Sequence, residues 1–309
     1  MFIEQTKQKS IQLFECYNAG FRPPQWIIPK FEEVYEYFKY TELYYDTEDI
    51  TEDRAIELYT KREPVNIAMS RNYNRGKMEK YFGYVQSTYM YYPIHPRSEP
   101  EKNGNIAVFC RTPVCIMATA REMTWKKANV LNVIGVALDN KEQADYLYLK
   151  NHSNPQEEYL KMVDKIFRKI VKCFIEHKFE NLILSAFGAG NFGYFAGELG
   201  IDVRETWKQC FYKYLDEMNY SQDTNIILNY IDFIPDYKLQ TRSPIEKMLW
   251  KTDQDTLDKT LFINAWDPHS VIGNGNEYDN SLDGYWGRIS AMSVIGTGTI
   301  NSNVRIIGL

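Results

Sequence analysis

The feature that most constrains the fold is a strand–helix–strand pattern in the middle of the chain. Apolar runs at 130–137 and 182–187 predict two buried strands. Between them, Asn154 and Pro155 begin a helix, because Asn suits the N-cap and Pro suits the first helical position. Apolar residues then recur on one helical face as far as His177. Two strands joined by a helix in this way predict a β-α-β unit of a parallel sheet.

The alternation of strands and helices continues toward the C-terminus. Asp202, with Glu205 three residues later, forms a capping-box pattern that predicts the start of a second helix. Further strands are expected at 105–109, 114–118, 226–234 and 260–263, and further helices at 244–250 and 285–294.

The first part of the chain has a different character. Residues 1–95 carry helical periodicity and no glycine loops. We therefore predict a helical N-terminal region, 1–95, that packs on an α/β domain, 96–309, with no flexible linker between them.

Two glycine-rich loops directly follow predicted strands. The first consists of Gly188, Ala189, Gly190, Asn191, Phe192, Gly193 and Tyr194. The second begins at Asn264 and includes Gly273, Asn274, Gly275 and Asn276. Ligands collect at the carboxyl ends of strands in open α/β sheets, and glycine lets backbone N–H groups approach a phosphate closely. Either loop alone also fits an ordinary turn, but the pair favours a nucleotide site, with Phe192 or Tyr194 against a ribose.

Carboxylates accompany the glycines. The second loop contains Asp267, Asp279 and Asp283, which are candidates for holding ribose hydroxyls or a water. The alternative is structural, because all three suit turns or helix caps. Asp139 and Asn140 end a predicted strand at the same edge and are candidates for contacting adenine or ribose.

Composition narrows the classes of function. The net charge of −5 argues against nonspecific nucleic-acid binding, and no apolar run reaches the length of about 20 residues that spans a membrane. The five cysteines are scattered and the histidines number only four, so we expect reduced thiols, no metal site and no cofactor. His269 has no matching Ser or Cys nucleophile, and Trp125 and Trp207 are expected in the core. We expect a monomer that acts in the cytoplasm, and this expectation also covers a microbial effector that acts in the cytosol of a host.

These motifs resemble a known family. The segment 112–141, the helix after Pro155 and the loop 188–193 resemble the second half of a macrodomain of the poly(ADP-ribose) glycohydrolase-like type. Asn264-Ala265-Trp266-Asp267 and the segment up to Gly284 resemble the loop of that family that surrounds the proximal ribose. Here this loop follows the diphosphate loop, a rearrangement that resembles a circular permutation, and the Gly-Gly-Gly … Gln-Glu-Glu signature is absent.

The resemblance implies a three-layer α/β/α sandwich with a mixed sheet that binds ADP-ribose or an ADP-ribosylated protein. It implies backbone contacts from loop 188–193 to the diphosphate and contacts from the second loop to the ribose. With the acids of that loop, it favours an ADP-ribosyl hydrolase that works through aspartates. Two alternatives remain open: a non-catalytic reader of ADP-ribose or a signal nucleotide, and an N-terminal region that serves as the interaction surface.

Overall fold

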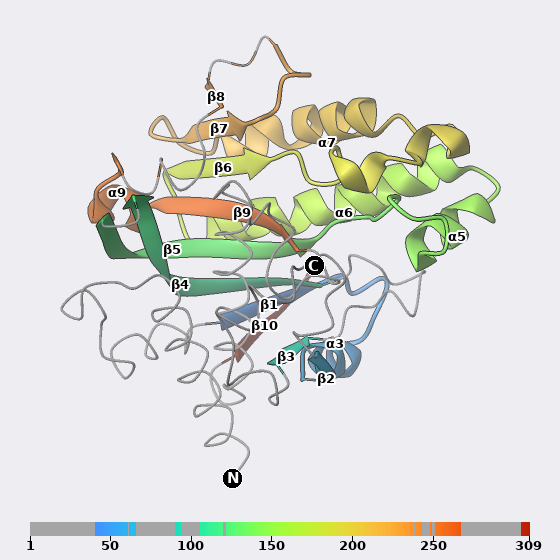
Figure 1. Ribbon diagram of the computed structural model, residues 1–309, viewed down its shortest axis with the longest axis horizontal. Coiled ribbons are helices and arrows are strands. Elements are labelled where there is room, and N and C mark those ends of the chain that lie inside the picture. The colour runs from blue at the N-terminus through green and yellow to red at the C-terminus, as the bar shows by residue number, and fades with distance from the viewer. Residues whose placement is uncertain are drawn as a thin grey trace.

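The computed structural model describes residues 41–60, 62–65, 90–93, 106–119, 122–235, 237, 239–242, 248, 251–266 and 304–309. Within these ranges, eight strands form one sheet (Figure 1). In spatial order they are β10 (Val304–Gly308), β1 (Thr41–Tyr45), β4 (Ile106–Thr119), β5 (Glu122–Ile134), β9 (Thr260–Trp266), β6 (Asn181–Ser185), β7 (Asn225–Asn229) and β8 (Gln240–Thr241). Of these strands, β4 alone runs against the others. The sheet is therefore mixed.

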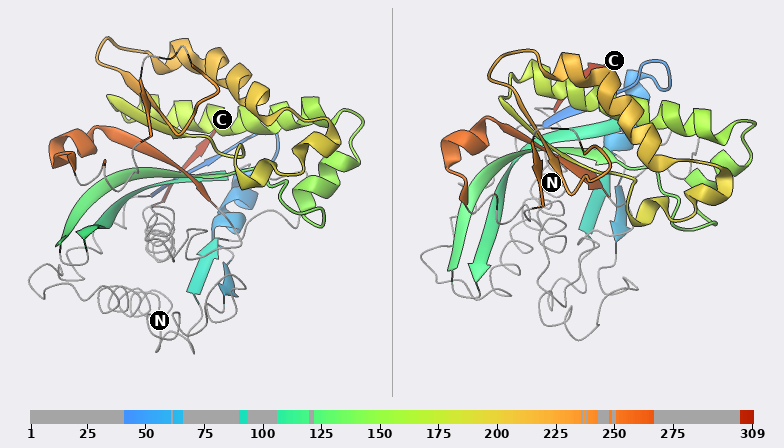
Figure 2. Two further views of the ribbon diagram at one scale, coloured as in Figure 1. Left: turned by 45° about the horizontal axis from the view of Figure 1, so that its top comes forward. Right: turned by 90° about the horizontal axis from the view of Figure 1, so that it is seen from above.

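Helices cover both faces of the sheet. Figure 2 shows α6 (Pro155–Glu176) and α7 (Val203–Met218) side by side on one face, while α3 (Glu52–Thr60) lies on the other, beside β1. The remaining described elements are α5 (Ala144–Lys150), α9 (Gln254–Asp258), the 3-10 helices η6 (Asn191–Gly193) and η7 (Ala196–Leu199), and a separate hairpin of β2 (Arg62–Val65) and β3 (Met90–Pro93). This arrangement confirms the predicted α/β class. No helix in the described ranges has the length and apolar character needed to cross a membrane.

Helix α6 begins and ends where its sequence predicts. The Asn154 side chain accepts a hydrogen bond from the Glu157 N–H, and Pro155 is the first helical residue. At the other end Lys178 takes a left-handed φ of 54°. The Phe179 N–H donates to the Phe174 carbonyl at 3.2 Å, and the Lys178 N–H donates to that of Ile175 at 3.0 Å. These two bonds form a Schellman motif, and Phe174 and Phe179 both join the core.

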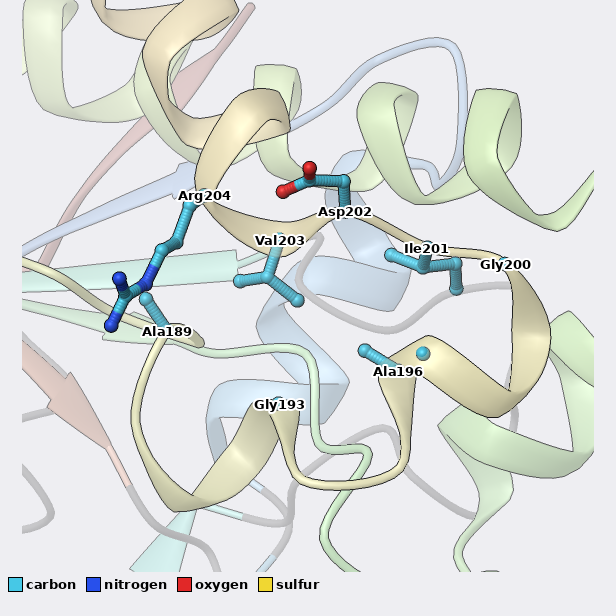
Figure 3. A pocket seen from close by; sticks show the side chains of 9 residues that line it. Ala189, Gly193, Ala196, Gly200, Ile201, Asp202, Val203 and Arg204 are labelled. Atoms are coloured by element: carbon cyan, nitrogen blue, oxygen red, sulfur yellow. The ribbon is translucent and has the colours of Figure 1, made fainter. Parts of the chain in front are cut away.

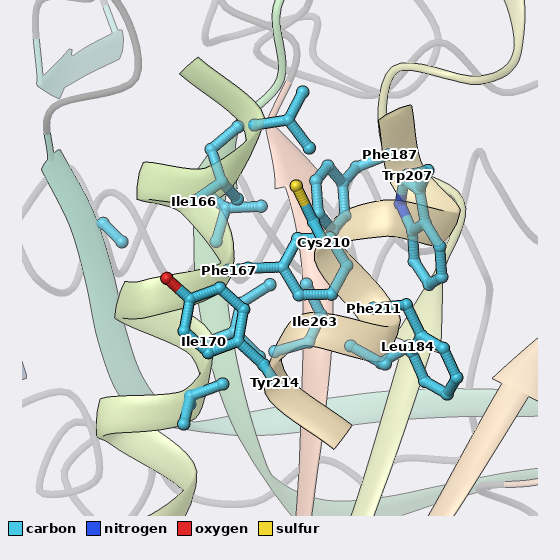
Figure 4. Packing of buried hydrophobic residues seen from close by; sticks show 14 of the residues in the cluster. Ile166, Phe167, Ile170, Leu184, Phe187, Trp207, Cys210, Phe211, Tyr214 and Ile263 are labelled. Atoms are coloured by element: carbon cyan, nitrogen blue, oxygen red, sulfur yellow. The ribbon is translucent and has the colours of Figure 1, made fainter. Parts of the chain in front are cut away.

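The main core lies between the sheet and the helices α6 and α7. Figure 4 shows Phe167 of α6 facing Trp207 of α7, with Leu184 of β6 and Ile263 of β9 below them. The Phe167 and Trp207 rings meet edge to face with centroids 5.0 Å apart. Trp207 is 1% exposed, which confirms its predicted place in the core.

Three predicted strands differ from those observed. The expected strands at 105–109 and 114–118 are one strand, β4, which pairs with β5 along nearly its whole length. Pro113 is tolerated there because β1 pairs only with residues 106–110 of β4, so among the described strands β4 is an edge at Pro113. The strand expected at 226–234 ends at Asn229, because Tyr230 takes a left-handed φ of 55°.

The described part of the N-terminal 95 residues contains strands as well as a helix. In their described part, α3 is helical, but β1 enters the central sheet and β2 and β3 form a hairpin. Tyr44 belongs to the main core, while Leu43 and Tyr45 pack in a second cluster on the opposite face. This alternation is typical of a strand that is buried on both sides. The helices predicted within residues 1–40 lie outside the described residues.

Ion pairs fasten β1 to α6. The buried Asp46, which directly follows β1, accepts from the Lys169 Nζ at 3.0 Å and from the Arg168 Nη1 at 3.1 Å. Lys165 pairs with Asp49 one turn earlier on α6. Burial lowers the pKa of Lys169, and the Asp46 carboxylate opposes that shift. The ion pair therefore joins the strand to the helix, because breaking it would leave a buried charge, Lys169 or Asp46, without its partner.

Candidate functional site

Three neighbouring parallel strands, β5, β9 and β6, have their carboxyl ends at the same edge of the sheet. β9 lies between β5 and β6 and runs parallel to both. The carboxyl ends of these strands therefore open into residues 135–140, residues 186–202, and the chain that continues from Trp266. Neighbouring parallel strands that end together create the crevice in which α/β proteins bind ligands. The sequence prediction that the two glycine loops follow strands of one parallel sheet is consistent with this order.

Loop 188–193 is tied to the segment that follows β5. The Leu138 N–H donates to the Phe192 carbonyl at 2.6 Å, and the Phe195 N–H donates to the Leu138 carbonyl at 2.8 Å. Within the loop, the Gly193 N–H donates to the Gly190 carbonyl at 3.0 Å. Among the described residues, none accepts a hydrogen bond from the N–H of Gly190 or Asn191. The loop thus has a fixed outline and two backbone donors for a ligand.

The glycines of this loop have separate roles. Gly188 takes a φ of +78°, and a Cβ built there would lie 3.1 Å from the Tyr159 hydroxyl. A Cβ at Gly193 would lie 2.9 Å from the Gly188 carbonyl oxygen. At Gly190, by contrast, a Cβ would meet no atom within 4 Å. Gly188 and Gly193 are therefore required by the turn, whereas Gly190 leaves its backbone open to a ligand.

The two aromatic side chains predicted to face a ribose, Phe192 and Tyr194, differ in their surroundings. A Cβ built at Gly135 would lie 3.4 Å from the Phe192 ring, so this ring packs on the backbone that follows β5. Tyr194 is 76% exposed, and its ring is perpendicular to that of Phe195, with ring centroids 4.8 Å apart. Of the two rings predicted to face a ribose, Tyr194 is the one with an exposed face.

Asp139 and Asn140 lie at the same edge but differ in their hydrogen bonds. The Asn140 Oδ1 accepts from the Glu142 N–H at 2.9 Å, which is a turn-forming contact. The Oδ1 of Asp139 is buried, and no described residue donates to it. A buried carboxylate oxygen without a donor is costly, so Asp139 is the better candidate for a ligand contact.

A buried polar pair supports the loop from below. The Asp145 Oδ2 accepts from the Ala137 N–H at 2.8 Å and holds the segment after β5. The Tyr159 hydroxyl lies under Gly188, and burial together with the Asp145 charge raises the pKa of Tyr159. Its proton therefore stays in place at physiological pH. Sequence reasoning did not identify either residue, because their roles depend on contacts across the fold.

A pocket of about 380 Å³ lies beside the loop, where η7 leads into α7 (Figure 3). Its lining is mostly backbone and small side chains, from Ala189, Gly193, Ala196, Gly197, Gly200, Ile201, Asp202, Val203 and Arg204. Asp202 is the predicted N-cap of α7, and its Oδ1 accepts from the Glu205 N–H at 2.9 Å. Arg204 is the cation of this lining. Sequence reasoning did not identify it, since no motif marks it.

The other predicted site residues belong to the second glycine-rich loop, which begins at Asn264. Asn264 is placed on β9, opposite Asn132 of β5 in the backbone register. The remaining predicted residues, Asp267, Gly273, Asn274, Gly275, Asn276, Asp279 and Asp283, lie outside the described residues, as does His269. In the described ranges, no group of three His, Cys, Asp or Glu residues is arranged to hold a metal ion.

The described half of the site can therefore bind an anion through backbone N–H groups, accept a hydrogen bond at Asp139 and offer the exposed ring of Tyr194. Known proteins add no further guide to its ligand: no protein-family model matches the chain, and no curated protein matches it.

Proposed function

We propose that the protein is an ADP-ribosyl hydrolase with a macrodomain-like α/β/α architecture, which removes ADP-ribose from a modified protein side chain or a related acceptor. The observation that carries the proposal is the position of β9 between β5 and β6. In this order β9, whose last residue is Trp266, lies between the strand that leads into residues 135–140 and the strand that leads into loop 188–193, which supports the proposal that the acid-containing loop faces loop 188–193. A diphosphate and the ribose attached to it need these two kinds of loop side by side.

Binding would use the described part of the site. The N–H groups of loop 188–193 donate to the diphosphate without a metal. The Asp139 carboxylate accepts from a hydroxyl or amino group of the nucleoside, and Tyr194 lies against a sugar face. The second loop, including Asn264 and the segment 273–276, surrounds the proximal ribose.

Hydrolysis would use an aspartate of the second loop. One carboxylate, Asp283 or Asp267, takes a proton from water as the water oxygen bonds to the anomeric carbon. The bond from that carbon to the acceptor breaks, its electron pair leaves with the acceptor, and the proton passes to the acceptor. A second carboxylate stabilises the oxocarbenium-like transition state. A positioned general base of this kind supplies about two to four orders of magnitude in rate.

The test is ADP-ribose release from proteins that carry Arg-, Ser- or Glu-linked ADP-ribose, followed by chromatography. Release from at least one linkage is expected, and Asp283→Ala should remove most turnover while most of the binding remains. Asp279→Ala, a change in the expected ribose contact, should instead weaken binding by about 1–3 kcal/mol. Binding without release from any linkage would leave the alternative, a reader that holds ADP-ribose in the same loops.

A further inference from the structure

We infer that Arg204 provides the positive charge for the phosphates held at loop 188–193, in the pocket between that loop and α7. This inference deepens the proposed function and rests on it for the identity of the ligand. The pocket joins Ala189 and Gly193 of the loop to Arg204 of α7. In Figure 3 the guanidinium of Arg204 is drawn beside Ala189, and both residues line the pocket.

Arg204 differs from the other cations of its helix, because it has no acidic partner within the described part of the chain. Lys208 pairs with Glu205 at 3.0 Å, and Lys213 pairs with Asp164 at 2.6 Å. Among the described residues, no carboxylate forms an ion pair with Arg204. An unpaired arginine beside a loop of backbone donors is suited to an anion, because its planar fork matches the geometry of phosphate.

An aromatic ring holds this arginine in place. The Arg204 guanidinium lies over the Phe233 ring, 5.7 Å from its centroid. Phe233 lies in the segment that follows β7, at the same edge of the sheet as loop 188–193. The cation is therefore positioned between the segments that follow β6 and β7. A side chain held before the ligand arrives loses less conformational freedom on binding.

The acid in the pocket lining does not neutralise Arg204. Asp202 accepts the Glu205 N–H as the helix cap, and among the described residues no ion pair joins its carboxylate to Arg204. Glu198, in η7, is paired with Lys141 at 2.6 Å. Both carboxylates thus already have partners. The space between Arg204 and the loop is lined by small residues and leaves room for a phosphate group.

The experiment measures the affinity of the full-length protein for ADP-ribose by calorimetry, for the wild type, Arg204→Gln and Arg204→Lys. Arg204→Gln should weaken binding about tenfold or more, as expected for a lost charge-assisted hydrogen bond. Its affinity should also depend less on NaCl concentration than that of the wild type. Arg204→Lys, which keeps the charge and loses the fork, should lie between them. The matched control is Lys208→Gln, one turn further along α7, which should bind like the wild type.

The outcomes separate this inference from the proposed function. If the wild type and Arg204→Gln bind ADP-ribose equally well, the role of Arg204 is refuted while the proposed function stands. If the wild type does not bind ADP-ribose but binds inorganic pyrophosphate, and Arg204→Gln does not, the anion site stands and the proposed function fails. If the wild type binds neither compound, both are refuted. Arg204 is exposed, so equal thermal melting of the variants is the expected sign that folding is unchanged.

Discussion

Glycines within one loop can have opposite requirements, as Gly190 and Gly193 show. Only Gly193 stands where a Cβ would press on backbone, at 2.9 Å from the Gly188 carbonyl oxygen. We predict that Gly193→Ala lowers the free energy of unfolding by about 1–3 kcal/mol, the usual cost of overpacking. Gly190→Ala, the matched control, should change it by less than about 0.5 kcal/mol, since its Cβ meets open space. Equal denaturation midpoints for the two variants would contradict this account of the turn.

The buried thiol of Cys210 gives a second prediction for a single residue. Burial raises the pKa of Cys210 to about 12, and the Asp164 carboxylate adds to that shift. At pH 8 only about one molecule in ten thousand then carries the reactive thiolate. We expect iodoacetamide to leave Cys210 unmodified in the native protein at pH 8 and to alkylate it in denaturant, as read by peptide mass spectrometry. Native labelling at the rate of an exposed cysteine would contradict the packing of α7 on the core.

At the scale of the element, local sequence signals determined what could be predicted. The starts of α6 and α7 were predicted correctly because Asn154 and Asp202 cap the nearest N–H groups, and these contacts span three residues. β1 was not predicted as part of the sheet, because its partners lie far away in the sequence: Thr41 pairs with Cys110 and with Val304. Strand pairing over such separations leaves little local trace.

The same distinction applies to the candidate site. Loop 188–193 could be predicted because its glycines stand together after an apolar strand. The roles of Asp145 and Arg204 could not, since Asp145 bonds to the segment after β5 and Arg204 lines a pocket with residues of the loop. The parts of the site that one segment carries are therefore visible in the sequence, and the parts that two segments form are not.

The C-terminal end of α6 offers a test of helix geometry. Lys178 is the residue after the C-cap and takes a left-handed φ of 54°, which costs a residue with a Cβ more than it costs glycine. We predict that Lys178→Gly raises the free energy of unfolding by about 0.5–1 kcal/mol, while Lys178→Ala brings no gain. Urea denaturation of the three proteins measures the difference. Destabilisation by Gly relative to Ala would show that the Schellman motif does not form.

At the scale of the whole molecule, segments from both ends of the sequence meet in the sheet. β10 and β1 are adjacent and parallel, and the Glu42 carboxylate joins the Arg305 Nη1 of β10, at 3.2 Å, to the His177 Nε2 beyond α6, at 2.7 Å. The described part of the N-terminal region is thus built into the α/β body through β1. The absence of a flexible linker and the packing of residues 1–40 stay predictions.

The attachment of β1 to α6 can be measured. Asp46→Ala would leave Lys169 buried without its partner, and we predict a loss of about 3–5 kcal/mol in the free energy of unfolding. Asp164→Ala, which breaks the more exposed pair with Lys213, is the control and should cost at most about 1 kcal/mol. If both variants unfold at the same urea concentration, the Asp46 pair does not hold β1 in the body.

The central claim is that the edge formed by β5, β9 and β6 binds ADP-ribose through the open backbone of loop 188–193. Calorimetric titration of the wild type and of Gly190→Val with ADP-ribose tests it most directly. The account predicts micromolar binding by the wild type, about −8 kcal/mol. It predicts no binding by Gly190→Val, whose side chain would occupy the open space at the loop while the fold keeps its melting temperature. Absence of binding by the wild type, or equal binding by a folded Gly190→Val, would contradict it.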